Sequence, residues 1–450
     1  MRKVITYGTY DLLHEGHLNL LRKAKNLGDY LIVGVTSDSF DINRGKLNVR
    51  NNLLARVQAV KETGLADEII VEDYVGQKID DIQKHEVDIF AIGSDWQQQF
   101  DYLKEFCNVI YIPRTEGISS TILRNKTQRI LRMGVVGAGR VASKFIPEST
   151  YVNGVHVVSV FDIDVKAGKK FQQTHELEEF YSDYKLFLES VDAVYIATPH
   201  LSHYHYSKHA LLMGKHVLCE IPLTLEVSQA EDLFLTANNL GLALLEASKT
   251  AFCPAFLRLV SLVKSGIIGR VISVRASISK LVSRDLREFD SLQAGGSMTE
   301  LSPLALMAMI KLLGIDIIDQ HLSVIMDDGV DTFVKGDFYY EDSIASIMLG
   351  LGVKTEGDMV ISGTKGYAYV PAPWWKTDFF EIRYEDQNQN KKFFYPYDGH
   401  GLRYEIQEFT SMICSDRKST FKLLPHESIR ITQIIESFKK GKNLRILRNR

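Results

Sequence analysis

The sequence predicts an α/β chain in which two Rossmann-like, doubly wound parallel-sheet domains are followed by an α+β domain with a large, mostly antiparallel sheet. The length of 450 residues is the first observation, because a single hydrophobic core stops growing at roughly 250–300 residues. The second is that short apolar runs alternate with amphipathic stretches through the first half, as in successive βαβ units. The third is a change after about Phe252, where long strand-like segments indicate a sheet packed on few helices.

The first domain is expected over residues 1–130. Its apolar runs and amphipathic stretches fit an open parallel sheet. In chain order, the elements are expected at Val4–Tyr7, Gly16–Leu27, Tyr30–Val35, Leu53–Thr63, Glu68–Val71, Lys78–His85, Asp88–Ile92, Tyr102–Phe106 and Val109–Ile112. The basic, polar stretch Asn125–Arg132 then marks a domain boundary.

Two further domains are expected, over residues 131–250 and 251–450. The second domain restarts the βαβ pattern with a glycine-rich turn after Met133. Its later strands are expected at Val157–Asp162, Ala193–Thr198, His216–Glu220 and Leu242–Glu246. The third domain has the long strands expected at Arg270–Ile278, Asp337–Leu349, Asp358–Gly363 and Phe379–Tyr384.

Composition excludes several classes of protein. With 45% hydrophobic and 24% charged residues, the chain is neither disordered nor of low complexity. A net charge of -3 provides no overall field that would recruit nucleic acid or an anionic membrane. The four cysteines lie far apart and form neither a disulfide framework nor a zinc motif. No stretch reaches the roughly 18 apolar residues of a membrane helix, so we expect a cytoplasmic protein that is neither exported nor membrane-spanning.

A histidine pair lies between the first expected strand and the first expected helix. The segment runs from Gly8 to His17 and includes Thr9, Asp11, His14 and Gly16. Backbone N–H groups at such a helix start favour an anion, and two histidines separated by Glu-Gly can both donate to phosphate oxygens. Ordinary turn histidines are the alternative interpretation, but the spacing and the later partners make a triphosphate site the better one.

The later partners are two segments that follow further strands. One is Gly93-Ser94-Asp95-Trp96, and the other runs from Arg114 to Thr121 and reads RTEGISST. Together with the histidine pair they resemble the cytidylyltransferase superfamily, and are most similar to bacterial glycerol-3-phosphate cytidylyltransferases over roughly residues 1–126. Ser94 departs from the aspartate of that family. The resemblance implies in-line transfer of CMP from CTP, with Mg²⁺ on the triphosphate and no metal site made of protein ligands.

The resemblance also assigns roles to individual residues of this sequence. The implied catalytic residues are His14, His17, Lys46 and Arg114. The implied nucleotide-binding residues are Gly8, Thr9, Asp11, Gly16, Arg56, Asp95, Thr115, Ser119, Ser120 and Thr121. The basic stretch Arg44–Arg56 would suit a phosphorylated acceptor, although a solvated basic loop is nearly as good an interpretation for Arg44 and Arg50 individually.

A glycine-rich turn opens the second domain. Gly137-Ala138-Gly139-Arg140-Val141-Ala142 follows an apolar strand and starts a helix, and Asp162 ends the next strand. A carboxylate there can accept both ribose hydroxyls and would repel a 2′-phosphate. NAD(H) is therefore favoured over NADP(H).

The turn and two later segments resemble the Gfo/Idh/MocA oxidoreductases over about residues 132–450. The segments are ATPHLSH at 197–203 and GKHVLCEIP at 214–222. The cofactor-binding residues that the turn and the resemblance indicate are Gly137, Gly139, Arg140, Val141, Asp162, Thr198, Pro199, His203 and Glu220. A homo-oligomer formed through the C-terminal domain is also implied.

The proton-transfer centre of that family is altered in this sequence. Ile221 occupies the position of the usual lysine, and after Gly295-Gly296 the usual aspartate and histidine positions fall on Glu300 and Leu304. Isoleucine cannot move a proton, so either another group replaces it or redox chemistry has been lost. Lys249 is the candidate catalytic replacement, with Glu300 and Tyr404 as further candidates. A structural role is an alternative for each of the three.

The two resemblances together predict a bifunctional enzyme. One half would activate a polyol phosphate such as glycerol 3-phosphate with CTP, for a surface polysaccharide or a similar polymer. The other half would make the alditol phosphate from a keto-sugar phosphate with NAD(P)H. In the alternative, the C-terminal half is a non-catalytic, cofactor-sensing or dimerising domain. A third interpretation, an adenylyltransferase, is disfavoured by the RTEGIS and GSDW segments.

Overall fold

The computed structural model describes residues 1–43, 49, 51–73, 76–97, 99–113, 130–415 and 417–447. It divides into two compact units, Met1–Ile130 and Leu131–Arg450. Several predicted site residues lie outside the described part: Lys46, Arg114, Thr115, Ser119, Ser120, Thr121 and the side chain of Asp95. The division of the second unit at residue 250 stays a prediction.

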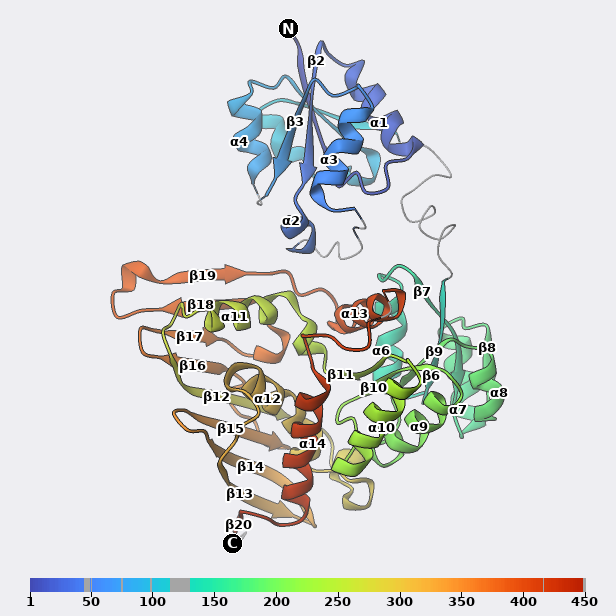
Figure 1. Ribbon diagram of the computed structural model, residues 1–450, viewed down its shortest axis with the longest axis vertical. Helices are drawn as coiled ribbons and strands as arrows, with labels where there is room; N and C mark the ends of the chain where they lie inside the picture. Colours follow the sequence, from blue (N-terminus) through green and yellow to red (C-terminus); the bar gives the residue numbers. More distant parts are fainter. Residues whose placement is uncertain are drawn as a thin grey trace. The chain divides into compact units, whose positions relative to one another are not determined.

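The first unit is built on a five-stranded parallel sheet with strand order β3-β2-β1-β4-β5 (Figure 1). Its strands are β1 (Lys3–Gly8), β2 (Tyr30–Thr36), β3 (Glu68–Glu72), β4 (Ile89–Gly93) and β5 (Asn108–Ile112). Its helices are α1 (Glu15–Lys25), α2 (Asp38–Asn43), α3 (Leu53–Glu62), α4 (Gln77–Lys84), η1 (Ser94–Trp96) and η2 (Asp101–Glu105). The strand order reverses between β1 and β4, which is where open α/β sheets bind ligands.

Both faces of this sheet are buried, because neighbouring residues of β1 point to opposite sides. Val4 belongs to the core cluster that includes Leu21 of α1 and Val60 of α3. Ile5 belongs to a second cluster that includes Ile82 of α4. This two-sided burial explains why the strands read as continuous apolar runs in the sequence.

The second unit begins with a six-stranded parallel sheet in the order β11-β10-β9-β6-β7-β8. Its strands are β6 (Leu131–Val136), β7 (Val155–Phe161), β8 (Glu179–Tyr181), β9 (Ala193–Ile196), β10 (His216–Glu220) and β11 (Leu244–Ala247). Its helices are α6 (Arg140–Ser149), α7 (Val165–Thr174), α8 (Tyr184–Glu189), η3 (His200–Ser202), α9 (His203–Leu212) and α10 (Val227–Asn239).

A nine-stranded mixed sheet completes the second unit, in the order β19-β18-β17-β16-β12-β15-β14-β13-β20. Its strands are β12 (Val271–Lys280), β13 (Asp319–Asp327), β14 (Val330–Tyr339), β15 (Ile344–Leu351), β16 (Met359–Gly363), β17 (Tyr367–Val370), β18 (Phe379–Arg383), β19 (Lys391–Phe394) and β20 (Leu444–Leu447). All pairs are antiparallel except β12 with β15 and β13 with β20.

Few helices accompany this sheet. They are η4 (Lys249–Phe252), α11 (Pro254–Lys264), η5 (Arg287–Phe289), η6 (Ser291–Gln293), α12 (Ser297–Leu313), η7 (Trp374–Lys376), η8 (Gln387–Gln389), α13 (Leu402–Cys414) and α14 (Pro425–Lys439). The buried helix α12 lies against β12, β14 and β15. The predicted fold class is therefore confirmed: two parallel sheets and one large, mostly antiparallel sheet.

One sequence-based element is wrong. The single strand expected at Asp337–Leu349 is a hairpin, in which β14 ends at Tyr339 and β15 begins at Ile344. The polar residues 341–343 lie in the turn, and the Tyr340 N–H donates to the Ser343 carbonyl over 2.9 Å. The apolar alternation continues on both sides of this short turn and hides it in the sequence.

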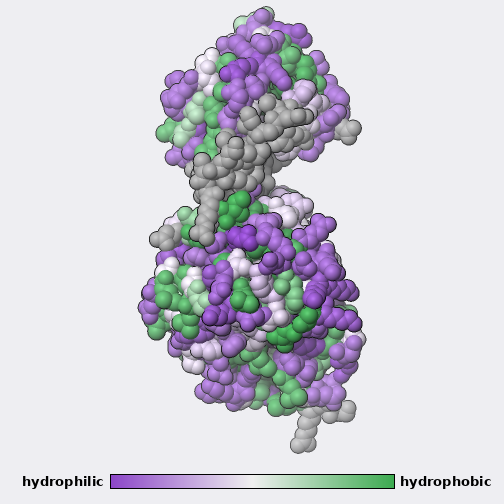
Figure 2. All heavy atoms as spheres, turned by 90° about the vertical axis from the view of Figure 1, so that its right-hand side faces the viewer, coloured by the Kyte–Doolittle hydropathy of each residue, from purple (hydrophilic) through white to green (hydrophobic). Residues whose placement is uncertain are grey.

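The visible surface of the second unit mixes hydrophilic and hydrophobic residues (Figure 2). On the face seen in Figure 2, hydrophilic residues are interspersed with separate hydrophobic patches. Within the described ranges, no helix combines the length and the apolarity needed to cross a bilayer.

Candidate functional sites

The loop after β1 holds the two histidines of the first unit side by side. His14 is the N-cap of α1, and its Nδ1 accepts a hydrogen bond from the Gly16 N–H over 3.1 Å. The His14 and His17 rings stack with centroids 3.9 Å apart, and the ring of the buried Tyr10 meets His17 edge-on at 5.4 Å. Because Nδ1 of His14 accepts, the neutral ring carries its proton on Nε2, which can donate to a phosphate oxygen.

A buried network fixes the start of this loop. Arg56 is fully buried, and its Nη1 donates to the carbonyls of Thr9 and Thr36 at 2.8 Å each. The same guanidinium forms ion pairs with Asp38 at 2.6 Å and with Asp41 at 3.3 Å. Thr9 Oγ1 donates to Asp41 over 3.0 Å. These contacts tie the carboxyl ends of β1 and β2 together, and a direct contact of Arg56 with a nucleotide stays a prediction.

The other described residues predicted to bind the nucleotide lie in the same loop. Asp11 is buried, and its carboxylate accepts from the Asn51 N–H over 3.0 Å, which ties the loop to the start of α3. Gly8 lies under the Tyr10 ring, where a Cβ atom would come within 3.0 Å of the ring carbons. Tyr10 and Asp41, which also contact this loop, were not among the predicted site residues, because only the tertiary structure brings Asp41 to Thr9.

The second unit has a cavity of about 520 Å³ at the carboxyl ends of β6, β7 and β9. Its lining residues are Gly137, Ala138, Gly139, Phe161, Asp162, Ile163, Ala197, Thr198, Pro199, Leu201, Ser202, Tyr206 and Gln293. Gly137 has φ +99°, and a Cβ there would lie 2.8 Å from the Ala197 carbonyl, so the turn requires glycine. Gly139 is the N-cap of α6, whose first N–H groups can face a pyrophosphate.

Asp162 borders the glycine turn from the end of β7. Its carboxylate accepts from the Ala138 N–H at 2.7 Å and from the Asp164 N–H at 2.8 Å. Each oxygen retains a lone pair for a ribose hydroxyl, whereas a 2′-phosphate would meet a like charge. Among the nine predicted cofactor residues, Gly137, Gly139, Asp162, Thr198 and Pro199 line the cavity.

Four predicted cofactor residues are not among the lining residues. His203 is fully buried, with Nδ1 2.9 Å from the Pro222 carbonyl and Nε2 2.8 Å from the Thr198 carbonyl, so it supports the Thr198 turn from behind. Burial lowers the pKa of His203 to about 4, although the two carbonyls favour its charged form. Arg140 pairs with Glu288 at 2.5 Å, and Val141 is an exposed residue of α6.

Glu220 is the fourth of these residues. It ends β10, accepts from the Tyr195 hydroxyl and is 3.3 Å from the Ile221 N–H. The Tyr195 ring is itself stacked on Phe145 of α6, with centroids 3.7 Å apart. Glu220 is therefore engaged with Tyr195, which packs on α6, and a contact of Glu220 with a cofactor stays a prediction.

The three candidates for proton transfer differ in their surroundings. Glu300 receives hydrogen bonds or ion pairs from His200 and Arg287 at 2.8 Å each. Burial would raise the pKa of Glu300, but His200 and Arg287 outweigh it and keep the group ionised. Tyr404 is buried, which raises its pKa to about 12. Its hydroxyl accepts a hydrogen bond from the Asp398 N–H and donates one to the Pro396 carbonyl. Lys249 is half-buried in η4, just after β11.

A buried carboxyl group that was not among the predicted site residues lies within electrostatic range of Lys249. Glu405 on α13 is fully buried, and neither of its oxygens has a hydrogen-bond partner in the described part of the chain. Burial, followed by the charge of Glu220, raises the pKa of Glu405 well above the ordinary value, while Lys249 opposes the shift. The shift favours the neutral, proton-carrying form of Glu405 relative to that of an exposed glutamate. No sequence signal marks it, because it lies on an ordinary amphipathic helix.

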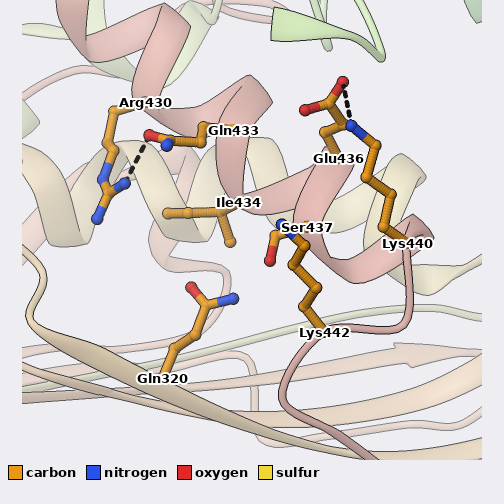
Figure 3. Close-up of a pocket in the computed structure, with 8 residues that line it drawn as sticks. All are labelled: Gln320, Arg430, Gln433, Ile434, Glu436, Ser437, Lys440 and Lys442. Atoms are coloured by element: carbon orange, nitrogen blue, oxygen red, sulfur yellow. Dashed lines mark hydrogen bonds and ion pairs between the residues drawn. The ribbon is translucent and has the colours of Figure 1, made fainter.

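A smaller cavity of about 170 Å³ lies between α14 and β13 (Figure 3). Three of its charged residues are engaged along the helix: Arg430 donates to Gln433 over 2.6 Å, and Lys440 pairs with Glu436 at 3.1 Å. It lies away from the carboxyl ends of the parallel strands, and we assign it no function.

Comparison with known proteins gives two family matches. A model described as cytidylyltransferase-like matches residues 5–126, and the Gfo/Idh/MocA model, described as an oxidoreductase family with an NAD-binding Rossmann fold, matches residues 131–247. A glycerol-3-phosphate cytidylyltransferase of Bacillus spizizenii is 52% identical over 124 residues, which is 28% of this chain and 95% of that protein.

The second unit has relatives of its own. A trans-1,2-dihydrobenzene-1,2-diol dehydrogenase of Oryctolagus cuniculus is 27% identical over 68% of this chain and 97% of that protein. The structure of a 3-ketoreductase from Actinomadura kijaniata with NADP superposes with a TM-score of 0.64 at 21% identity, covering 71% of this chain and all of that one. Similarity at this level supports the fold.

Proposed function

Because the chain belongs to the cytidylyltransferase-like family through its first unit and carries a Gfo/Idh/MocA oxidoreductase domain in its second, we propose that it is a bifunctional enzyme. The first unit transfers CMP from CTP to a polyol phosphate such as glycerol 3-phosphate, releasing pyrophosphate. The second reduces a keto-sugar phosphate to the alditol phosphate that the first unit then activates.

The stacked histidine pair carries the proposal for the first unit. His14 and His17 lie together at the start of α1, where their N–H donors and the helix N-terminus would stabilise charge developing on the attacked phosphate and the leaving pyrophosphate. In this mechanism the acceptor phosphate attacks the α-phosphorus of CTP in line, so no covalent intermediate with the enzyme is needed. Mg²⁺ would enter with the triphosphate.

The cavity at the glycine turn carries the proposal for a nicotinamide dinucleotide in the second unit. A turn that only glycine fits and a carboxylate anchored beside it suit a pyrophosphate and a ribose with free hydroxyls, so NAD(H) is favoured. When bound, the cofactor supplies a hydride. Lys249 would donate the proton to the substrate carbonyl oxygen.

Pyrophosphate release tests the first activity. The purified chain is incubated with CTP, Mg²⁺ and a panel of three- to five-carbon polyol phosphates, with ATP replacing CTP as the nucleotide control. Release with CTP and at least one acceptor is expected, and His17→Asn should abolish most of it. If none of the acceptors releases pyrophosphate, the proposed transferase activity is wrong.

A second candidate function follows from Ile221 and Leu304, which replace the usual lysine and histidine. In that case the second unit binds the dinucleotide without turning it over and acts as a sensor or as a structural domain. Titration of NADH by fluorescence, followed by triose, ketotetrose and ketopentose phosphates in the same cuvette, separates the two candidates. NADH oxidation supports the reductase, and tight binding without oxidation supports the sensor.

A further inference from the structure

Four basic side chains from separate segments of the second unit are brought together where the dinucleotide fold meets the loops of the large sheet. They are Lys144 of α6, Lys249 of η4, Lys376 of η7 and His400, which precedes α13. We call these four side chains the basic cluster. No sequence motif links them, because their segments are far apart along the chain.

Two hydrogen bonds hold the backbone of these segments in place. Thr250 Oγ1, next to Lys249, donates to the carbonyl of Trp375, next to Lys376, over 2.8 Å. The backbone N–H of His400 donates over 3.1 Å to Glu148, which lies one helical turn after Lys144 on α6. Tertiary contacts between distant segments therefore assemble the cluster.

The members of the cluster lie within electrostatic reach of one another. Burial and then the charges of Lys249 and Lys144 lower the pKa of Lys376. Burial, followed by Lys144, also lowers the pKa of His400, while the charge of Glu148 opposes the shift and Lys376 and Lys249 add to it. Proximity of like charges is unfavourable, so a bound anion would stabilise the charged forms of Lys376 and His400.

Three carboxyl groups lie near the cluster, those of Glu148, Glu220 and Glu405. Glu148 is engaged by Arg403, whose Nε and Nη2 donate to it at 3.0 Å each. Burial raises the pKa of Glu220 and of Glu405, and the charge of Lys249 opposes both shifts. In the ranges that the structure describes, none of the four members of the basic cluster forms an ion pair. Lys144 and Lys376 therefore keep N–H donors for an anion.

The position of the cluster points to the substrate. Lys249 follows β11, and Lys144 lies on the helix that Gly139 starts, so the cluster lies along the same carboxyl edge of the parallel sheet as the cofactor cavity. The glycine turn already provides a place for the cofactor pyrophosphate. Lysine and histidine N–H donors are suited to phosphate oxygens.

We propose that Lys144, Lys376 and His400 bind the phosphoryl group of the carbonyl substrate reduced by the second unit, next to Lys249, which would protonate the carbonyl oxygen. This inference rests on the proposed reductase function and specifies its substrate class as phosphorylated ketoses. Two sources share this chemistry: a phosphate monoester of the sugar, and the diphosphate of a sugar already linked to a nucleotide.

Two measurements on the full chain test the proposal. Inorganic phosphate is titrated into the NADH complex, with the fluorescence of Trp375 beside the cluster as readout. Steady-state NADH oxidation is then measured with a ketopentose 5-phosphate, with the same ketopentose unphosphorylated, and with its CDP-linked form. The variants are Lys376→Met and Lys144→Met, and the control is Lys185→Met, an exposed lysine of α8.

Each cluster variant should weaken phosphate binding and raise KM for the phosphorylated ketose by roughly 10- to 100-fold, as expected for the loss of one charge-assisted hydrogen bond. KM for the unphosphorylated ketose, the affinity for NADH and the behaviour of Lys185→Met should not change. Whichever of the phosphate monoester and the CDP-linked ketose has the lower KM identifies the source of the phosphoryl group.

Three results would overturn the inference. They are absence of phosphate binding to the wild-type NADH complex, competition between inorganic phosphate and NADH, and an equal loss of activity on phosphorylated and unphosphorylated ketoses. Failure of the proposed reductase looks different: no ketose oxidises NADH, yet phosphate still binds in a manner that depends on Lys376. In that case the anion site stands and the reductase function falls.

Discussion

Removal of the buried Arg56 guanidinium should destabilise the first unit severely. The substitution Arg56→Met keeps an unbranched side chain but removes the guanidinium that lies 3.3 Å from the fully buried Asp41 carboxylate. It also removes the hydrogen bonds to the carbonyls of Thr9 and Thr36. Breaking a buried pair by deleting one partner costs about 3–5 kcal/mol, and we expect the free energy of unfolding of this unit to fall by that amount.

Hydrogen–deuterium exchange on the full chain measures this loss separately for each unit, through the amides of β1 and β2. The control is Arg22→Met, which removes an ion pair to Glu15 in which both side chains are about half exposed, 50% and 49%. Such surface pairs contribute about 0–1 kcal/mol. The double substitution of Arg56 to Met and Asp41 to Asn should recover part of the loss, because the buried negative charge that faces Arg56 is then removed as well.

The same variant separates the two roles considered for Arg56. If the residue holds the loop after β1, loss of CMP transfer should accompany faster amide exchange. A variant with unchanged exchange in β1 and β2, a stability loss below about 1 kcal/mol and a large rise in KM for CTP would refute the structural argument. It would support direct contact with the nucleotide instead.

Three further predictions concern single side chains. His17→Asn should lower kcat for pyrophosphate release by about 10²–10³-fold and leave NADH binding unchanged; equal loss of both would indicate misfolding. Asp162→Ala should weaken NADH binding more than NADPH binding in parallel fluorescence titrations, because the ribose acceptor and the charge that repels a 2′-phosphate disappear together. The pKa of His203 in the folded chain is about 4, below the ordinary 6.5 of the unfolded chain. The unfolded chain therefore takes up the proton first as the pH falls, and the free energy of unfolding decreases between about pH 6.5 and 4. Urea unfolding measures the difference in free energy of unfolding between wild type and His203→Gln, and this difference should shrink by about 3 kcal/mol over that pH range. A difference that stays constant would contradict the lowered pKa of His203.

Much of the fold could be predicted because both parallel sheets are buried on two sides. Continuous apolar strands separated by amphipathic helices predicted the elements from β1 to β4 within one or two residues, except the short helix α2, which was not predicted. The strands of the large sheet were harder to delimit from the sequence, because apolar and polar residues alternate along them. The short turn at 341–343 does not interrupt this alternation, so two strands read as one.

The candidate sites divide in the same way. Gly137 and Asp162 were predictable because a local backbone requirement and a fixed spacing define them. The partners of Arg56 were not, because Thr36 and Asp41 come from separate segments. Glu405 was missed for the same reason: its neighbours Glu220 and Lys249 are distant in sequence, and only burial distinguishes it from a surface glutamate.

The presence of both units on one polypeptide has a consequence for metabolic flux. Separate genes allow a cell to adjust the amounts of two consecutive enzymes independently, but here every molecule synthesised adds one site of each kind. In the reaction sequence proposed above, the concentration of the shared alditol phosphate then depends on the two turnover rates and on the supply of CTP and reduced cofactor. Changing the expression level alters the throughput of both steps in equal proportion.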